Sequence, residues 1–407
     1  MSALNRDRYL PWALLGGLGW FFVYADRAVL SPLLHAFGLQ FHVGPGQLGL
    51  ISSVFFLTYT AVQIPAGYLA DRLSPRILLG VGYIGFGIFI AATGAAASYA
   101  ALLGLSALAG AFQGVYYPTQ FAIAARRIPE RALPIANAVI TAGMGAGIAG
   151  GYLVAALLAP SDWRVPVRIL GLLTVAVGIW LYLVTPSHVE RPPRAVPSPA
   201  RRLATRRFAA LLAINFCSLY PFFFLLAWLP YDLGQDHALH GLWLGLAASL
   251  PTAFAIPATI LWNRHAAVGR LRRIRLLLTV ALLALLAMGL VHGIWPLLLG
   301  LALYGLSGKL VLDPMILSEV AQSLEGAQYG RAYGTLNFVG MLASVVAPAL
   351  SGLLVQRFGS FSLAFVAAAF MLLAALVLSM ALSAPAQVGP PPGTKRPPVA
   401  AQGGGSA

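Results

Sequence analysis

Long apolar runs separated by short polar segments divide nearly the whole chain. Twelve apolar windows of helical length can be placed, at residues 10–34, 47–70, 77–97, 100–123, 134–158, 166–185, 208–233, 241–262, 274–292, 295–319, 332–355 and 361–383. A helix needs about 20 mainly apolar residues to cross the hydrocarbon core of a bilayer. The pattern therefore predicts an all-α polytopic membrane protein with twelve transmembrane helices.

A polar segment in the middle of the chain separates these windows into two sets of six. Residues 186–207 are rich in Pro and Arg and have no apolar periodicity, so we expect an extended cytoplasmic linker. The expected organisation is an N-terminal six-helix half at 1–185, the linker at 186–207, a C-terminal six-helix half at 208–385 and a disordered tail at 386–407.

Composition and charge agree with a membrane location. The chain is 59% hydrophobic with a mean hydropathy of +0.82, which lies outside the range of soluble proteins. Most of the 26 Lys and Arg residues fall on one face of the predicted topology, together with both termini. Because positive residues stay in the cytoplasm, we expect a multi-pass protein of the cell inner membrane with both termini cytoplasmic. This topology explains the net charge of +15, so no nucleic-acid partner is expected.

A compact charged segment, Ile64–Ile77 with the sequence IPAGYLADRLSPRI, lies between the second and third windows. Gly67 allows two helices to approach closely, Asp71 can cap or pair at a helix end, and Arg72 and Arg76 hold the loop on the cytoplasmic side. The segment resembles the signature loop between helices two and three of the major facilitator superfamily. That resemblance implies a conformational latch and two pseudo-symmetric six-helix halves; an ordinary charged loop is the alternative.

Two adjacent charges interrupt the first apolar window. The segment 24–31, YADRAVLS, resembles the aspartate-arginine signature of the anion:cation symporter family, a branch of the superfamily that carries organic anions such as sugar acids. Residues 63–67 and 334–340 are further parallels. The resemblance implies that Asp26 is a proton site and that Arg27 binds the anionic substrate or regulates Asp26. Contacts to neighbouring helices would be a purely structural role for the pair.

The fourth window departs from that family. The family carries a glutamate shortly before an aromatic-proline pair, and alignment on Tyr117-Pro118 places Gln113 at that position. Glutamine cannot titrate, so the family's two-proton coupling is not expected through this position. Gln113, Tyr116 and Tyr117 can still donate hydrogen bonds to an oxygen-rich ligand, although either tyrosine could instead only pack between helices.

Lys309 and Asp313 are charged residues within the tenth window. A charge inside a membrane helix costs about 2.5–3.5 kcal/mol on insertion scales, so each one needs a reason. Four residues apart, the two lie on one helical face and can neutralise each other. We expect Lys309 to attract a carboxylate or phosphate. Asp313 would hold Lys309 in place until a substrate or a proton replaced that interaction. A structural salt bridge between helices is the alternative.

Single polar residues in the other windows are weaker candidates. Tyr59 and Asn337 could face a substrate cavity, but isolated polar residues in membrane helices often tie helices together.

The sequence carries no enzyme signature. It has no His or Cys cluster at metal spacing, no Gly-rich phosphate loop with its lysine and no nucleophile elbow. We therefore expect no enzyme activity, no cofactor and no metal. The expected function is proton-coupled secondary transport of a small organic anion by alternating access, by a monomer whose other partners are protons and the lipid bilayer. An efflux pump for amphipathic compounds and a non-transporting membrane sensor are the alternatives.

Overall fold

The structure is a computed structural model of the 407-residue chain. It describes residues 10–70, 73–128, 133–185, 187, 205–263, 269–322 and 329–382. Within these ranges it does not describe the side chains of residues 70, 117–118, 121–127, 133–138, 140–141, 263, 321–322 and 329–331.

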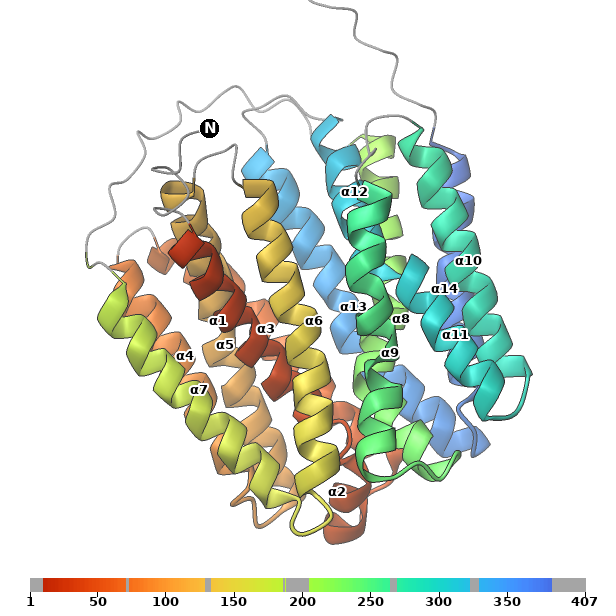
Figure 1. The fold of residues 1–407 in the computed structure, drawn as a ribbon, viewed down its shortest axis with the longest axis horizontal. Coiled ribbons are helices and arrows are strands. Elements are labelled where there is room, and N and C mark those ends of the chain that lie inside the picture. Colours follow the sequence, from red (N-terminus) through yellow and green to blue (C-terminus); the bar gives the residue numbers. More distant parts are fainter. Residues whose placement is uncertain are drawn as a thin grey trace, which may run out of the picture.

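The described residues form a bundle of long helices (Figure 1). In chain order these are α1 (Leu10–Val29), α2 (Leu34–Phe41), α3 (Pro45–Ala70), α4 (Pro75–Thr93), α5 (Tyr99–Arg127), α6 (Leu133–Leu158), α7 (Arg164–Val184), α8 (Arg206–Gln235), α9 (Gly241–Asn263), α10 (Arg270–Leu290), α11 (Ile294–Ser307), α12 (Lys309–Gln322), α13 (Tyr329–Phe358) and α14 (Ser362–Met380). Each predicted window coincides with one helix or one pair of helices, which confirms the all-α fold class.

The helices have the length and composition of membrane spans. Within the described residues, ten helical segments are long and apolar enough to cross a bilayer, with α11 and α12 joined as one, or eleven if the bent pair α1 and α2 is one span. The described part of α6 contributes a shorter apolar stretch, Ala142–Leu158. The protein is therefore a multi-pass membrane protein.

The first window is not one continuous helix, contrary to the prediction of a span over 10–34. Helix α1 ends at Val29, and α2 leaves at an angle of 43°. Pro32 lies in the break and has no backbone N–H to continue a helical ladder. Ser31 instead donates its side-chain hydrogen bond to the carbonyl of Ala227 in α8 (2.6 Å).

The tenth window is also broken, where the apolar pattern predicted continuity. Helix α11 ends at Ser307, Gly308 follows, and α12 begins at Lys309. The Gly308 amide donates to the carbonyl of Tyr304 (2.6 Å), and a Cβ at Gly308 would lie 2.7 Å from that same oxygen. A side chain at this position would therefore crowd the Tyr304 carbonyl, and Lys309 stands at the start of a half-helix inside the span.

Glycines of α6 let α1 pack directly against it. A Cβ at Gly143, Gly147 or Gly151 would overlap the backbone of α1 at Gly17, Phe21 and Ala25 respectively. These three glycines recur every four residues and so face one neighbour. This glycine-rich segment therefore serves the packing of α1 against α6.

Gly147→Ala is expected to destabilise the protein by about 1–3 kcal/mol, because the added methyl group forces α1 and α6 apart. Gly104→Ala is the matched control, since a Cβ at Gly104 has no neighbour within 4 Å. The measurement is the thermal unfolding midpoint of both variants in detergent. Equal midpoints for the two variants would contradict this account of the α1–α6 contact.

The helices gather in two groups, α1–α7 and α8–α14, which lie on opposite sides of the bundle (Figure 1). The groups meet mainly where α3 packs on α13 and α6 packs on α9. Near the end of the bundle that holds α2, the Ser53 hydroxyl donates to the Val345 carbonyl (2.7 Å), and the Gly46 amide donates to the Gln356 side chain (2.9 Å). The two groups are therefore closely packed at the α2 end.

Candidate functional site

Arg27 lies in α1 among aromatic rings, with only 8% of its surface exposed. Its Nε donates a hydrogen bond to Oε1 of Gln113 in α5 (2.7 Å). The guanidinium carbon lies 4.6 Å from the ring centroid of Tyr59 and 4.9 Å from that of Tyr24. The buried Nη2 atom has no hydrogen-bond partner. Buried donors are normally satisfied, so Nη2 is a place for an acceptor supplied by a ligand.

Asp26 is directed toward a different neighbour. Its side chain is fully buried, and Oδ2 accepts a hydrogen bond from the hydroxyl of Thr174 in α7 (2.6 Å). Its other oxygen, Oδ1, has no partner. Adjacent residues on a helix point about 100° apart, which explains why Asp26 does not neutralise Arg27. The guanidinium therefore retains its positive charge without a carboxylate among the described side chains within ion-pair distance.

Lys309 and Asp313 form the ion pair that their spacing predicted, through Nζ and Oδ2. The Lys309 side chain is 9% exposed and that of Asp313 is 30% exposed. Lys309 Nζ also lies 5.3 Å from the ring centroid of Phe222 in α8. Asp313 thus meets the more open side of the pair, while Lys309 is buried against an aromatic wall.

The two cations, from opposite groups of helices, stand at the two ends of a set of aromatic rings. Between them, the rings of Phe56 in α3 and Phe223 in α8 pack with centroids 4.9 Å apart. We call this assembly the central cluster, and its members are Tyr24, Arg27, Phe56, Tyr59, Gln113, Phe222, Phe223 and Lys309.

The central cluster carries more positive than negative charge. Arg27 and Lys309 supply two cations, and among the described side chains Asp313 is the carboxylate that pairs with one of them. Like charges repel one another more where water is excluded than they do in solution. An anion placed between them would relieve that repulsion and accept a hydrogen bond from Arg27.

Asn337 bridges the two groups at some distance from Arg27. Its Nδ2 donates to Oε1 of Gln63 in α3 (3.0 Å). Tyr59 interacts with both Gln63 and Arg27, so Asn337 is connected to the central cluster through these two side chains. In this structure Asn337 ties two helices together, which is the alternative to lining a substrate cavity that the sequence left open.

Tyr116 packs between helices in this structure, which is one of the two roles considered for it. Its ring packs on Tyr83 (centroids 4.8 Å apart) and on Trp20 (5.8 Å). It is one helical turn beyond Gln113, which takes the position next to Arg27 instead. The backbone of Tyr117 belongs to α5, but its side chain lies outside the described residues.

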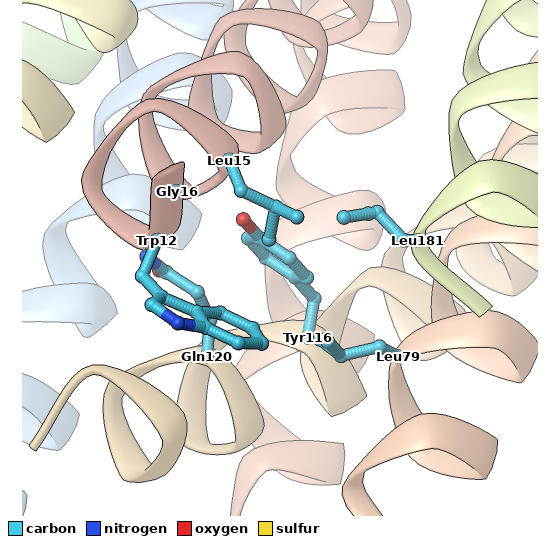
Figure 2. A pocket seen from close by; sticks show the side chains of 7 residues that line it. All are labelled: Trp12, Leu15, Gly16, Leu79, Tyr116, Gln120 and Leu181. Atoms are coloured by element: carbon cyan, nitrogen blue, oxygen red, sulfur yellow. The ribbon is translucent and has the colours of Figure 1, made fainter. Parts of the chain in front are cut away.

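Figure 2 shows a small hollow near the start of α1, lined by Trp12, Leu15, Gly16, Leu79, Tyr116, Gln120 and Leu181. It has room for about one water molecule, with a volume of about 10 Å³. Gln120 also accepts a hydrogen bond from Trp20. The hollow belongs to the packing of the first helical group and is too small for an organic substrate.

The charged loop between α3 and α4 is only partly described. Asp71 and Arg72 lie outside the described residues. The guanidinium carbon of Arg76 lies 4.3 Å from the ring centroid of Tyr182 in α7, so Arg76 holds the start of α4 against α7. The close helix approach predicted at Gly67 is not found among the described residues, where a Cβ there would have no neighbour within 4 Å.

Glu319 forms a second buried charge cluster, at the end of α12. It is 2% exposed and pairs with Arg207 of α8 (2.9 Å) and Arg270 of α10 (3.4 Å). These pairs fasten three helices of the second group to one another. No group of three or more His, Cys, Asp or Glu side chains in the described parts of the chain is arranged to hold a metal ion.

Sequence reasoning missed several members of the site. Thr174 is a single polar residue within an apolar window, and nothing in the sequence shows that it faces Asp26. Phe222 and Phe223 belong to a run of three phenylalanines after Pro221, which reads as ordinary apolar sequence. The run of phenylalanines, in a chain that also has two intramembrane cations, is the sequence feature that could have indicated aromatic contacts to those cations.

The comparison with protein families decides the classification. The model of the Major Facilitator Superfamily matches residues 17–308 and, a second time, residues 211–404. The chain belongs to this superfamily. The member described here is therefore a multi-pass membrane transporter with the all-α fold class that its sequence predicted.

Relatives and a solved structure agree with this membership. The chain is 26% identical to a protein of Cupriavidus necator named "Probable sulfoacetate transporter", covering 86% of this chain and 87% of that one. It is 25% identical to a multidrug efflux protein of Bacillus subtilis, covering 81% and 83%. Its fold is similar to a bacterial homologue of the human lysosomal transporter Spinster in an inward-facing, occupied conformation, with a TM-score of 0.77, 16% identity and coverage of 94% and 97%.

Proposed function

We propose that this superfamily member is a secondary active transporter of a small organic anion, of the carboxylate or sugar-acid type, and that it couples transport to protons. The observation that carries this proposal is the buried Arg27, which makes no ion pair with a described carboxylate and whose Nη2 has no hydrogen-bond partner, with Lys309 at the other end of the same aromatic rings. A buried cation without a paired carboxylate is costly in a membrane protein, and an anionic ligand offsets that cost. The relative named as a sulfoacetate transporter supports the same class of substrate.

The proposed anion binds with its charged group at Arg27. Nη2 is a free donor, and a carboxylate or sulfonate oxygen is a strong acceptor for it. Gln113 fixes the guanidinium through Nε, so the free nitrogen is held in a defined orientation. Lys309 contributes a second attraction from the other group of helices. Binding therefore couples the two groups, as a shared substrate site in this fold requires.

Asp26 and Asp313 are the proposed proton-coupling groups. Asp26 has one satisfied and one free carboxylate oxygen in a buried setting, and a proton can bind at the free Oδ1. Asp313 is partly exposed and is released when the anion takes its place beside Lys309. A proton on either carboxylate increases the positive charge available to the substrate. Proton and anion binding then favour each other, which is the basis of symport.

Alternating access is proposed to use the two helical groups as moving halves. With both termini in the cytoplasm, the α2 end lies on the outer side of the inner membrane. Hydrogen bonds between Ser53 and Val345 and between Gly46 and Gln356 close that end, so the described conformation is closed to the outside. Opening toward the outside must break them. The linker at residues 186–207 and the latch role of Asp71, Arg72 and Arg76 are further parts of this proposal.

An efflux pump for amphipathic compounds is the second candidate, which the relative named as a multidrug efflux protein favours. Such a pump would need the aromatic rings of the central cluster but would have little need for Arg27. A non-transporting sensor would produce no exchange of solute across a membrane. No enzyme activity and no cofactor are part of any of these candidates.

Asp26→Asn is expected to abolish uptake driven by a proton gradient while exchange of anion for anion continues. Asparagine keeps the size of the side chain and its acceptor for Thr174 but cannot take up a proton. Gradient-driven uptake and anion exchange are both measured in proteoliposomes that contain equal amounts of reconstituted protein. Asp162→Asn is the matched control, since Asp162 is 40% exposed and pairs with Arg164 at the bundle surface. Unchanged gradient-driven uptake in Asp26→Asn would remove this residue from the coupling scheme.

A further inference from the structure

Two buried tyrosines place their hydroxyl groups side by side on the face of α1 that carries Asp26. The Tyr83 hydroxyl, from α4, donates a hydrogen bond to the carbonyl of Gly19. A Cβ at Gly19 would overlap the hydroxyl oxygen of Tyr116, from α5, and would lie 3.4 Å from that of Tyr83. The two hydroxyl groups also interact with each other. They are therefore in a position to exchange a proton.

The Tyr83 hydroxyl lies about one helical turn from Asp26, toward the start of α1. Gly19 and Asp26 are seven residues apart and so share one face of the helix. The Gly19 carbonyl points along the helix axis toward the amide of Val23, three residues before Asp26. Helical side chains lean over the turn N-terminal to their own Cα, which directs the Asp26 carboxylate back toward this place. Its Oδ1 is buried without a partner, so it is the oxygen that can exchange a proton with a nearby hydroxyl.

Helix α7 supports the same placement of Tyr83. A Cβ at Gly178 would lie 3.0 Å from Cβ of Tyr83, so the tyrosine packs directly on α7. Thr174, which donates to Asp26, is one turn away along that helix. Arg27, the charged neighbour of Asp26 on α1, is turned toward α5 instead. Hydroxyl groups from α4 and α7 thus flank the buried carboxylate.

The small hollow near the start of α1 lies at the other end of the tyrosine pair. Tyr116 and Gln120 line it, and Figure 2 shows the Tyr116 hydroxyl directed toward α1 beside Gly16. Its volume of about 10 Å³ suits one water molecule, and the hydroxyl and the Gln120 amide are the polar partners that such a water needs. Trp12 lines the hollow nearest the start of α1, which is the cytoplasmic end in the proposed topology.

We infer that Tyr83 and Tyr116 form a proton relay between Asp26 and the cytoplasm. This inference rests on the proposed role of Asp26 in proton coupling and deepens it. In the conformation closed to the outside, protonated Asp26 gives its proton to the Tyr83 oxygen while Tyr83 gives its own proton to Tyr116. Tyr116 passes its proton to a water in the hollow, which leaves as hydronium. Each hydroxyl gains one proton and loses one, and Asp26 is left as a carboxylate.

The relay fits the burial of its members. Asp26 is fully buried, and Tyr83 and Tyr116 are at most 2% exposed, so bulk water does not reach the carboxylate directly. A purely structural role of the tyrosines would rest on their rings, which pack on each other with centroids 4.8 Å apart. Phenylalanine keeps that ring and removes only the hydroxyl, so it separates the two roles.

The test measures protonation of Asp26 itself and needs no substrate. After a rapid pH jump on the full-length protein in detergent, time-resolved infrared spectroscopy follows the C=O stretch of protonated carboxyl groups. The band that is missing in Asp26→Asn belongs to Asp26. We expect Tyr83→Phe and Tyr116→Phe each to slow the change of this band at least about tenfold, since a positioned proton-transfer group typically contributes a factor of about 10²–10⁴.

Tyr99→Phe is the matched control. The Tyr99 hydroxyl also donates to a backbone carbonyl, that of Gln47 (2.7 Å), but at the start of α3 and away from Asp26. The rate at which the Asp26 band changes should be the wild-type rate in this variant. Unfolding midpoints in detergent check the fold of all three variants. Each relay tyrosine has its own variant, so a folding defect in one leaves the other to decide.

Two results would overturn the inference, and they differ in what else they overturn. If the Asp26 band changes at the wild-type rate in both relay variants, the relay fails and Asp26 stands as the proton-coupling group. If no band depends on Asp26 over the working pH range, Asp26 does not titrate, and the relay and the proposed proton coupling fail together.

Transport of anions is tested separately, by counterflow of labelled benzenesulfonate and labelled gluconate. Benzenesulfonate remains charged at all working pH values and does not leak through lipid as a neutral acid. A slowed Asp26 band in the relay variants, with no counterflow of either anion by the wild type, would establish the relay and overturn the proposed transport of organic anions alone.

Discussion

Arg27→Ala is expected to reduce anion uptake at least about 30-fold at subsaturating substrate. Removing one partner of a buried, hydrogen-bonded charge pair typically costs 2–5 kcal/mol, and each 1.4 kcal/mol is a factor of ten in affinity. Arg27 is 8% exposed and offers the free Nη2 donor, so water cannot replace its contribution. The measurement is initial uptake of labelled benzenesulfonate into proteoliposomes as a function of concentration.

The controls separate loss of charge from loss of shape. Arg27→Lys keeps the positive charge, so it should retain part of the uptake. It loses the planar guanidinium, which donates to Gln113 through Nε while Nη2 stays available to the anion. Arg164→Ala removes an arginine whose side chain is 34% exposed beside Asp162, and uptake should not change. Normal uptake by Arg27→Ala with an unchanged unfolding midpoint would exclude Arg27 as the anion's partner.

Lys309→Ala is expected to lower both stability and transport. The substitution leaves Asp313 as an unpaired carboxylate within the span. Breaking a fully buried pair costs about 3–5 kcal/mol, but the Asp313 side chain is 30% exposed, so we expect about 1–3 kcal/mol here. The unfolding midpoint in detergent measures the first effect, and uptake at equal reconstituted protein measures the second.

The double variant Lys309→Ala/Asp313→Ala distinguishes a substrate role from a structural salt bridge. It removes both charges, so stability should recover toward that of the wild type. If Lys309 attracts the anion, uptake stays low in the stable double variant. Recovery of uptake together with stability would show that the pair only holds α12 in place, and normal uptake by Lys309→Ala alone would remove Lys309 from the site.

Intramembrane charges could be found from the sequence because each one is costly. Asp26, Arg27, Lys309 and Asp313 interrupt apolar windows, and the structure connects Arg27 with Lys309 through aromatic rings although the two are far apart in the chain. The pairing of Lys309 with Asp313 followed from helical spacing. Windows of about 20 apolar residues likewise predicted the positions of the spans, since the thickness of the bilayer sets their length.

Features that depend on which face a residue presents could not be predicted. Gly308 lies where α11 ends and α12 begins, although the hydropathy continues unchanged across this point. Tyr116 faces Tyr83, one helical turn away from the site, and no pattern in a uniformly apolar helix reveals that orientation. Thr174 meets Asp26 only because α7 packs beside α1.

Counterflow is the measurement that tests the central claim most directly. Proteoliposomes loaded with an unlabelled organic anion are diluted into a trace of the labelled anion, with a panel that includes benzenesulfonate and gluconate, and with amphipathic cations as comparison. The account predicts a transient accumulation of label above equilibrium for at least one anion, which requires no proton gradient. Accumulation of amphipathic cations with none for any anion would contradict the account in favour of efflux, and no accumulation of any solute by folded protein would contradict transport itself.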